Sequence, residues 1–296
     1  MTLKHIIVGL CLAGSTAVSA QNSWEEVEIK PVALNGNVHV IYGAGGNIGV
    51  SAGGDGVFII DDQFAPLTER LKTAIAGISD KPIRFVINTH FHFDHTGGNE
   101  NLGSAGAVIV AHDNVRQRLT AGSFIKAFNV TTEPKVGPAL PVVTFNDQMS
   151  LHLNGEDARI IHLPNAHTNS DSIVHFRTSN VIHMGDTFFN GRFPFIDVPN
   201  GGTIGGVIKM AELAISAADE QTVVIPGHGQ VTDLAGLQAY HDMLVAARDV
   251  VAAKKGEGLS LEELVALKPL ADVHPEWQQA STDGVDLFVS TIYESL

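Results

Sequence analysis

The apolar and polar positions in the first third of the chain predict short strands separated by glycine turns. Alternating or continuous apolar runs bounded by turn residues are typical of strands. The predicted strands are residues 27–34, 37–42, 49–51 and 57–60. Between the second and third lies the glycine-rich segment 43–49, which predicts a flexible hairpin flanking a site. A dinucleotide-binding loop is disfavoured, because Ile48 occupies the position of its last glycine.

Helical and extended patterns alternate along the rest of the chain. Amphipathic periodicity indicates helices, and short apolar runs indicate the strands between them. The predicted helices are residues 66–78, 114–121, 204–218, 234–255, 261–267 and 283–295. The predicted strands are residues 83–88, 108–111, two or three within 142–163, then 172–176, 181–183 and 222–225. Strands interspersed with helices, and no linker composition between them, indicate a layered α/β architecture.

Four potential metal ligands follow the predicted strand 83–88. They are His90, His92, Asp94 and His95. At the end of a strand His90 and His92 project to the same side, and Asp94 and His95 can face a neighbouring position once the chain turns. The chain has 14 histidines, so histidine pairs arise by chance. Three histidines and an aspartate in this order after an apolar strand nevertheless predict a metal site.

Three later segments each offer one further ligand directly after a short apolar strand. His167 follows the extended region 142–163, Asp186 follows strand 181–183, and His228 follows strand 222–225. Each lies in a turn marked by glycine or proline. Side chains at the carboxyl ends of strands meet at one edge of an α/β sheet. These residues are therefore candidates to complete two metal sites.

The N-terminal segment, residues 1–20, has the pattern of a signal peptide. Lys4 precedes an apolar run at residues 6–13, and small residues lead to a cleavage site after Ala20. The run is too short to span a bilayer comfortably, which favours cleavage over a stable membrane anchor. We expect a periplasmic or secreted protein with a single domain, residues 21–296, that includes a helical C-terminal extension.

The charge balance of the chain restricts its partners. It has 18 Lys and Arg against 32 Asp and Glu, a formal net charge of −14. Phosphate backbones are repelled by such a surface, which disfavours nucleic acid as a partner and phosphodiesters as substrates. We expect a small-molecule substrate, and the sequence does not determine the oligomeric state.

The seven candidate ligands, in this order, resemble those of the metallo-β-lactamase superfamily. They are His90, His92, Asp94, His95, His167, Asp186 and His228. The resemblance implies a four-layer αβ/βα sandwich with two Zn²⁺ ions at one edge of its sheets. It further implies that one zinc is held by His90, His92 and His167, the second by Asp94, His95 and His228, with Asp186 bridging them.

The residue at position 186 separates classes within the superfamily. Subclass B1 β-lactamases carry a cysteine there, whereas this chain has Asp186, and its only cysteine is Cys11 in the predicted signal peptide. The mature protein would then have no thiolate ligand. A bridging aspartate is similar to that of glyoxalase II, the lactonases and other dinuclear hydrolases.

Several other polar residues have two interpretations. Asp61 and Asp62 end a buried strand, where one of them is either an acceptor for the free N–H of a ligand histidine or an ordinary turn residue. Asp171 is a candidate to brace the loop of His167. The remaining strand histidines are expected to be surface or packed residues and not ligands: His152, His162, His175 and His183.

The segment 188–195, directly after Asp186, combines four aromatic residues with one arginine. It predicts a substrate wall with an anchor for a carboxylate, and the alternative is a hydrophobic plug that packs its own loop. The candidate substrate-lining residues are Phe188, Asn190, Arg192 and Phe193, with Ile48 of the glycine hairpin covering the opposite side.

This ligand set predicts a hydrolase. Two zinc ions bridged by Asp186 would lower the pKa of a shared water to about 7, and Asp94 would orient it and carry a proton. A cyclic amide or ester is the favoured substrate, with a β-lactam as the specific candidate. A lactonase, another esterase or a glyoxalase II-like thioesterase is the alternative, although glutathione thioesters belong to cytosolic chemistry. A phosphodiesterase and a di-iron redox protein are less favoured.

Overall fold

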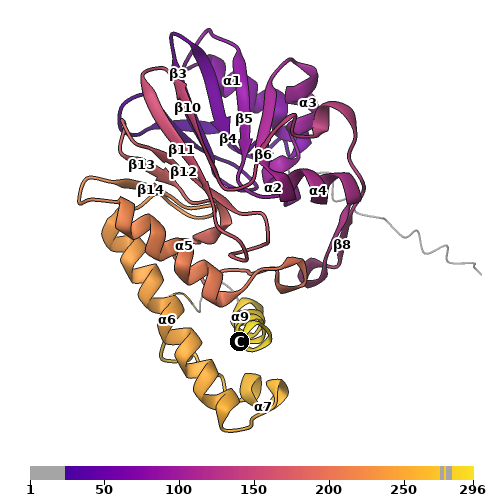
Figure 1. Ribbon diagram of the computed structural model, residues 1–296, viewed down its shortest axis with the longest axis vertical. Helices are drawn as coiled ribbons and strands as arrows, with labels where there is room; N and C mark the ends of the chain where they lie inside the picture. Colours follow the sequence, from indigo (N-terminus) through magenta and orange to yellow (C-terminus); the bar gives the residue numbers. More distant parts are fainter. Residues whose placement is uncertain (1–23, 274–276, 278–281) are drawn as a thin grey trace, which may run out of the picture.

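The computed structural model describes residues 24–273, 277 and 282–296, and Figure 1 shows two stacked sheets enclosed by helices. The predicted signal peptide, residues 1–20, lies outside the described residues. Within the described residues no helix combines the length and the hydropathy that crossing a bilayer requires.

The N-terminal half forms a seven-stranded sheet in the order β1-β2-β3-β4-β5-β6-β9. Strands β1 to β4 are antiparallel neighbours, whereas β4, β5, β6 and β9 run parallel. The strands are β1 (Lys30–Ala33), β2 (Val38–Tyr42), β3 (Ile48–Gly53), β4 (Gly56–Ile60), β5 (Ile83–Asn88), β6 (Val108–His112) and β9 (Val143–Phe145). The parallel strands therefore bring their carboxyl ends to one edge.

A second, five-stranded sheet has the order β10-β11-β12-β13-β14. Its strands are antiparallel except for β13 and β14, which are parallel. They are β10 (Gln148–Leu153), β11 (Glu156–His162), β12 (Ser172–Phe176), β13 (Val181–His183) and β14 (Val223–Ile225). A separate two-stranded hairpin, β7 (Ser123–Ile125) and β8 (Val130–Thr132), was not predicted from the hydrophobic pattern.

Helices cover the outer faces of both sheets (Figure 1). The α-helices are α1 (Thr68–Ala76), α2 (Phe93–Thr96), α3 (Asn99–Ser104), α4 (Asp113–Ala121), α5 (Ile204–Ala217), α6 (Leu234–Gly256), α7 (Leu261–Ala266) and α9 (Thr282–Ser295). The 3-10 helices are η1 (Ala65–Leu67), η2 (Lys126–Phe128), η3 (Gly137–Ala139), η4 (Gly185–Thr187) and η5 (Val198–Asn200). Most predicted elements are confirmed, and the predicted helix 66–78 divides into η1 and α1.

Three hydrophobic layers hold these elements together. One lies between the sheets, where Phe58 of β4 stacks on Phe176 of β12 at 5.7 Å between ring centroids. A second joins the first sheet to α1, with Leu71 and Ile75 buried against it. The third joins the second sheet to the C-terminal helices. This order of helix, sheet, sheet and helix confirms the predicted αβ/βα sandwich.

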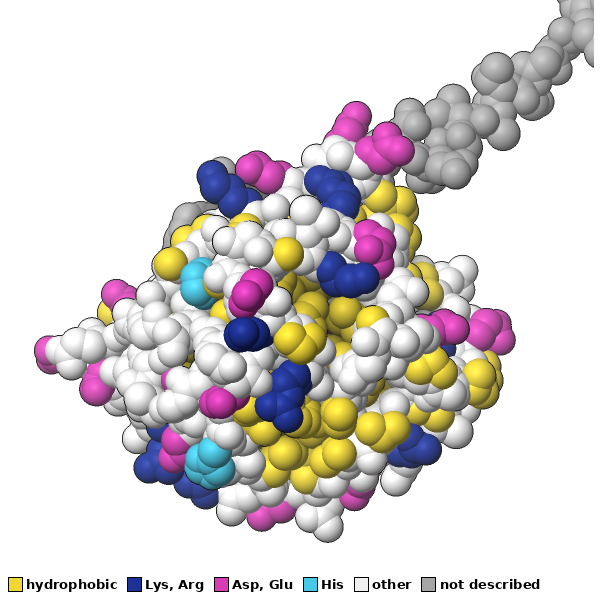
Figure 2. All heavy atoms as spheres, turned by 90° about the horizontal axis from the view of Figure 1, so that it is seen from above, with side chains coloured by type: hydrophobic (Ala, Val, Ile, Leu, Met, Phe, Trp, Pro, Cys, Tyr) yellow, Lys and Arg dark blue, Asp and Glu magenta, His cyan; other side chains and the backbone are white. Residues whose placement is uncertain are grey.

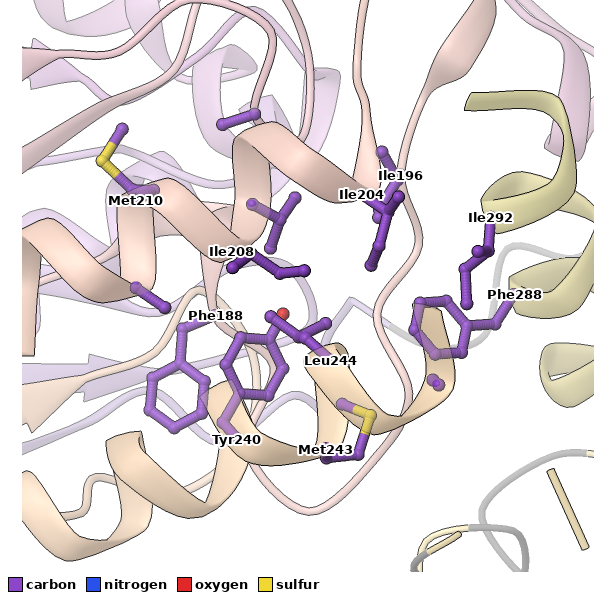
Figure 3. Close-up of a cluster of buried hydrophobic side chains, with 14 of the residues drawn as sticks. Phe188, Ile196, Ile204, Ile208, Met210, Tyr240, Met243, Leu244, Phe288 and Ile292 are labelled. Carbon is purple, nitrogen blue, oxygen red and sulfur yellow. The ribbon is translucent and has the colours of Figure 1, made fainter. Parts of the chain in front are cut away.

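The C-terminal helices pack through a large buried cluster. Phe288 and Ile292 of α9 face Leu244 of α6 and Ile204 of α5, and Tyr240 packs against Phe188 (Figure 3). Burying side chains of this size stabilises the contact by roughly 1.5–3 kcal/mol each. The extension is therefore attached to the sandwich by a continuous core.

The end of the molecule opposite the C-terminal helices has a mixed surface. Hydrophobic side chains gather near the middle of this face with Lys and Arg side chains beside them, and Asp and Glu lie mainly toward its edge (Figure 2). The acidic excess of the chain is thus spread over the periphery here.

Candidate metal centre

The histidine motif begins where β5 ends, and the buried ring of Phe91 determines its direction. Phe91 is 2% exposed and packs with Val115 and Leu119 of α4. Because Phe91 points toward α4, its neighbours His90 and His92 point to the other side. The chain then turns into the short helix α2, which carries Asp94 and His95. The predicted division of the motif into two pairs thus arises from a strand end followed by one helical turn.

All seven predicted ligands lie together in two clusters. The potential ligand atoms within each cluster lie within 4.8 Å of one another. The first cluster contains His90, His92, His167 and Asp186, and the second contains Asp94, His95 and His228. Four loops, which follow β5, β11, β13 and β14, supply these side chains. Residues up to 138 positions apart in the sequence thus meet because their strands end at the same edge (228 minus 90).

The Asp186 carboxylate lies between the two clusters. Its Oδ1 is 3.0 Å from His95 Nε2, and its Oδ2 is 3.3 Å from His228 Nε2. The same Oδ2 lies 3.8 Å from His90 Nε2 and 3.7 Å from His167 Nε2. One carboxylate therefore faces both groups of imidazoles, which is the arrangement that a bridging ligand requires.

Outer partners hold the ligand rings in fixed orientations. His90 Nδ1 lies 3.0 Å from Thr89 Oγ1, and His167 Nδ1 lies 2.7 Å from the carbonyl oxygen of Phe195. Such contacts select the tautomer of a ligand histidine and orient its ring. The opposite nitrogen of each ring, Nε2, is left facing the interior of the cluster.

Two carboxylates perform the same task for the other buried rings. His92 Nε2 lies 3.0 Å from Asp197 Oδ2, and His95 Nδ1 lies 2.7 Å from Asp61 Oδ2. Asp61 also accepts from the backbone N–H and the hydroxyl of Thr89. Of the two interpretations of Asp61 and Asp62, Asp61 is the acceptor for a ligand histidine. Asp197 was missed by sequence reasoning.

The imidazole nitrogens and carboxylate oxygens of the two clusters are better placed to bind metal ions than to hydrogen-bond with one another. His90 Nε2 is buried and has no hydrogen-bond partner, and the 3.0 Å contact between His95 Nε2 and Asp186 Oδ1 is outside hydrogen-bond alignment. Buried polar atoms without partners cost about 1–3 kcal/mol each. Imidazole nitrogen and carboxylate oxygen are ligands that Zn²⁺ accepts, and coordination would satisfy these atoms.

Electrostatics differ between the clusters. Burial lowers the pKa of His90, and it lowers the pKa of His167 to about 4, so both rings are neutral at neutral pH. Burial raises the pKa of Asp186, but His228 and His95 hold it well below its usual range. Burial opposes protonation of His228, yet Asp186 raises its pKa to about 9. Metal ligands must be deprotonated, so an ion at the second cluster has to displace a proton.

The glycine hairpin predicted beside the site closes over the second cluster. A Cβ on Gly46 would lie 2.1 Å from His95 Cε1, so only glycine allows this approach. Asn47 donates from Nδ2 to the carbonyl oxygens of Pro226 and Gly229, both at 2.8 Å, and from its backbone N–H to Gly227 at 2.7 Å. These bonds tie the hairpin to the loop that carries His228.

Other predicted residues occupy supporting positions. Asp171 Oδ2 accepts from the backbone N–H of Thr168 at 2.5 Å and from its hydroxyl at 3.0 Å, which braces the loop of His167. His183 is buried and hydrogen-bonds through Nε2 to the carbonyl oxygen of Asn47. His152, His162 and His175, like His183, belong to neither ligand cluster.

A cavity of about 340 Å³ opens onto the metal clusters. His92, Asp94, Asp186 and His228 line its floor. Its walls are mainly aromatic and apolar: Phe93, Ile125, Phe128, Phe189, Phe193, Pro194, Phe195, Trp277 and Leu287, with Arg192 among them. Arg192 lies over the ring of Phe189 at 5.3 Å, and that ring stacks on His228 at 5.1 Å.

The predicted substrate-lining residues divide into two groups. Arg192 and Phe193 line the cavity. Ile48 does not, because it begins β3 and is buried against β2 and α1. Phe188 points away into the C-terminal core, 4.6 Å from Tyr240. Asn190 instead donates to the carbonyl oxygen of Gln230 at 2.8 Å. The segment 188–195 thus lines the cavity with some of its side chains and packs into the protein core with others.

Comparison with known proteins identifies the class. The metallo-beta-lactamase superfamily model matches residues 33–228, so the chain belongs to this superfamily. It is 24% identical over 258 residues to a linear primary-alkylsulfatase of Pseudomonas sp. (strain ATCC 19151), covering 71% of this chain and 47% of that protein. It is 27% identical over 167 residues to a hydroxyacylglutathione hydrolase of Polaromonas sp. (strain JS666 / ATCC BAA-500), covering 56% of each. The chain thus spans about half the length of these relatives.

Solved structures confirm the fold. The DIM-1 metallo-beta-lactamase superimposes with a TM-score of 0.61 at 20% identity, over 75% of this chain and 99% of that one. A double mutant of the sec-alkyl sulfatase PisA1 gives a TM-score of 0.68 at 14% identity, over 90% of this chain and 50% of that one. Together with the match to the superfamily model over residues 33–228, this confirms the superfamily predicted from the seven ligand positions.

Proposed function

We propose that this chain is a dinuclear zinc hydrolase that cleaves a cyclic amide or ester. The observation that carries the proposal is the position of Asp186, whose two oxygens lie 3.0–3.8 Å from four imidazoles of both clusters. His90, His92 and His167 would hold one ion, and Asp94, His95 and His228 the other. Two such ions supply a water acidified to near neutral pH and a Lewis acid that polarises the scissile carbonyl.

Residues of the chain perform the remaining tasks. Asp94 lines the cavity and its side chain is 20% exposed, so its carboxylate can reach a reacting water and carry the proton to the leaving group. The aromatic walls exclude bulk water around the scissile bond, which strengthens electrostatic interactions there. Asp61 and Asp197 keep His95 and His92 oriented. Asp94 and Asp186 are the catalytic carboxylates in this scheme.

A β-lactam is the specific substrate that we propose first. The cavity has the volume of a small-molecule site, and Arg192 stands at its wall as a partner for a carboxylate. A β-lactam offers both a strained cyclic amide and such a carboxylate. Because Asp186 stands where subclass B1 β-lactamases carry a cysteine, a lactone, which is a cyclic ester without that carboxylate, is the alternative.

A thioester is the second candidate, and the name of one relative favours it. One of the two relatives is called a hydroxyacylglutathione hydrolase, and the other is called a linear primary-alkylsulfatase. Thioester and sulfate ester substrates therefore belong in the same test. The phosphodiester alternative ranks lower because the chain carries a formal net charge of −14, and elemental analysis distinguishes the di-iron redox alternative from the zinc hydrolase.

We further propose export to the periplasm or the medium, on the pattern of residues 1–20. N-terminal sequencing of the protein recovered outside the cytoplasm is expected to begin at Gln21. A mature protein that begins at Met1 would contradict export by cleavage.

The reaction is tested with purified, zinc-loaded protein and a panel of nitrocefin, a homoserine lactone, S-lactoylglutathione, an alkyl sulfate and a phosphodiester. We expect about two zinc per chain by elemental analysis. We expect turnover of nitrocefin or the lactone, which Asp186→Asn abolishes and His152→Ala, a histidine outside both clusters, does not change. No nitrocefin turnover would reject the β-lactam, and two iron per chain would reject the zinc hydrolase.

A further inference from the structure

We propose that the substrate carries an apolar chain, and that Leu287 of α9 sets the length of chain that the cavity accepts. This inference rests on the proposed function, because the apolar chain is part of the substrate that is hydrolysed at the metal centre. It adds what that function leaves open, namely the part of the substrate that is not cleaved.

The walls of the cavity are suited to hydrocarbon. Phe128 and Phe195 lie 4.9 Å apart between ring centroids, and Phe193 and Trp277 lie 6.3 Å apart. All four rings line the same cavity, directly above the ligands on its floor. A substrate whose scissile bond reaches Asp94 and Asp186 would therefore place its neighbouring atoms among these rings, which favours apolar groups.

One wall comes from the C-terminal helices and not from the part shared with the superfamily. The superfamily match ends at residue 228, whereas Trp277, Gly284 and Leu287 line the cavity. Loops and extensions added to a common fold determine specificity more often than its core does. This wall therefore lies outside the segment that matches the superfamily model.

The orientation of α9 explains why Leu287 is available to a substrate. The helix docks on the core through four residues that are at most 9% exposed: Val285, Phe288, Val289 and Ile292. Figure 3 shows Phe288 and Ile292 of this set. Leu287 is only partly buried and lies off this docking face. An apolar side chain that the core does not cover therefore lies in the substrate cavity.

A second cavity lies behind Leu287. It measures about 250 Å³, and its lining includes Lys126, Ser290 and Thr291. The two cavities share Phe195 and Leu287 as lining residues. The backbone carbonyl of Phe195 is held by His167, whereas Leu287 belongs to neither ligand cluster. Of the two lining residues that the cavities share, Leu287 is therefore the one to change with the smaller effect on the metal centre.

The burial of the substrate's apolar chain predicts how kcat/KM depends on the length of that chain. Each methylene transferred from water into the cavity raises kcat/KM by about fourfold. The gain ends where the chain meets Leu287. Chain-length profiles therefore have an optimum, and the size of residue 287 determines where it lies.

The test compares wild type, Leu287→Ala and Leu287→Phe on two series of substrates, N-acyl homoserine lactones and 4-nitrophenyl esters, with acyl chains from acetyl or butanoyl to dodecanoyl. We expect the optimum to move to longer chains in Leu287→Ala and to shorter chains in Leu287→Phe. Leu267→Ala is the matched control, because Leu267 is 59% exposed at the end of α7. A flat profile, or one optimum shared by all variants, would overturn the proposal.

A binding measurement separates this inference from the proposed reaction. The chain has two tryptophans, so Trp24→Phe leaves Trp277 as the reporter of the cavity. We expect n-decanol to quench its fluorescence in the zinc-loaded protein, and Leu287→Phe to weaken that binding. Binding of decanol without turnover of any panel substrate would reject the reaction and support the apolar cavity. Turnover without decanol binding and without chain-length dependence would reject the proposed apolar-chain site and support the proposed reaction.

Discussion

The two ligand clusters differ in how firmly the protein holds them before any ion binds. Each of the three histidines of the first cluster is at most 3% exposed and has an outer partner: Thr89 for His90, Asp197 for His92 and the Phe195 carbonyl for His167. In the second cluster Asp61 fixes His95, whereas the side chains of Asp94 and His228 are 20% and 17% exposed and face the cavity. The first site is preorganised and the second is open.

This difference assigns separate tasks to the two sites. Ligands that are already oriented lose little freedom when an ion binds, so the first ion should bind more tightly. The open ligands of the second cluster line the cavity, where a substrate arrives. We therefore expect one tightly held ion and one more exchangeable ion beside the substrate.

The comparison is tested most severely by removing one histidine from each cluster. His167→Ala should remove the tight ion and lower kcat/KM by roughly 10³-fold, since an ion contributes several kcal/mol to the transition state. His228→Ala should keep one zinc per chain and lose only the weaker ion. Elemental analysis after dialysis measures both, with His152→Ala as control. If His228→Ala loses both ions while His167→Ala keeps one, the ranking of the sites is wrong.

A smaller loss is expected from Gly46→Ala. The added Cβ would lie 2.1 Å from a ring that is fully buried and fixed by Asp61, so His95 must move out of the second cluster. We expect the affinity for the second ion to fall by roughly 10–100-fold, as for other losses of ligand orientation, while the first ion remains. Gly54→Ala, which meets nothing within 4 Å, is the control. Retention of both ions at wild-type affinity would show that the hairpin yields instead.

The candidate ligands could be predicted from the sequence because each lies in a recognisable local pattern of residues. His90 to His95 form one motif, and Asp186 and His228 each follow a short apolar strand. The layered α/β architecture followed from the alternation of strands and helices, and the four-layer sandwich followed from the resemblance of the ligand set to the superfamily. Such signals survive because a strand delivers its carboxyl end to a defined edge of the sheet.

The outer partners and the substrate walls carry no such local signal. Asp197 lies 105 positions from His92, in a loop whose path depends on the packing of η5. Phe188 and Phe189 are adjacent, yet one enters the C-terminal core and the other lines the cavity. Ile48 was expected near the substrate, but β3 begins at this residue and turns it into the core. These positions are determined by tertiary packing.

The carboxylates that orient His92 and His95 offer a milder test of the difference between the two ligand clusters. Asp197→Asn keeps the shape of the side chain but removes the charge that lies beside His92, and Asp61→Asn does the same beside His95. Asp197→Asn should weaken the first ion by about tenfold to 100-fold and leave the second unchanged. Asp61→Asn should weaken the second ion by a similar factor and the first ion less, because Asp61 also holds Thr89, the outer partner of His90. Zinc titration against a competing chelator resolves the two affinities, and Asp80→Asn, an exposed residue, is the control. Equal weakening of both ions by either variant would show that the clusters act as one unit.

The pH dependence of metal affinity should also distinguish the two sites, and it is the smallest of the expected effects. His228 has a pKa of about 9 because Asp186 lies beside it, so below that pH an ion must displace its proton. His167 has a pKa of about 4, and its ring is already neutral. Burial opposes protonation of His95, the other histidine of the second cluster, but Asp186 and Asp94 raise its pKa well above the usual range. Between about pH 7 and pH 9, affinity for the second ion should therefore rise by about tenfold or more per pH unit, while affinity for the first, at His167, stays level. Replacing His228 with Asn should reduce this slope, and a slope unchanged in that variant would assign the displaced proton to another ligand.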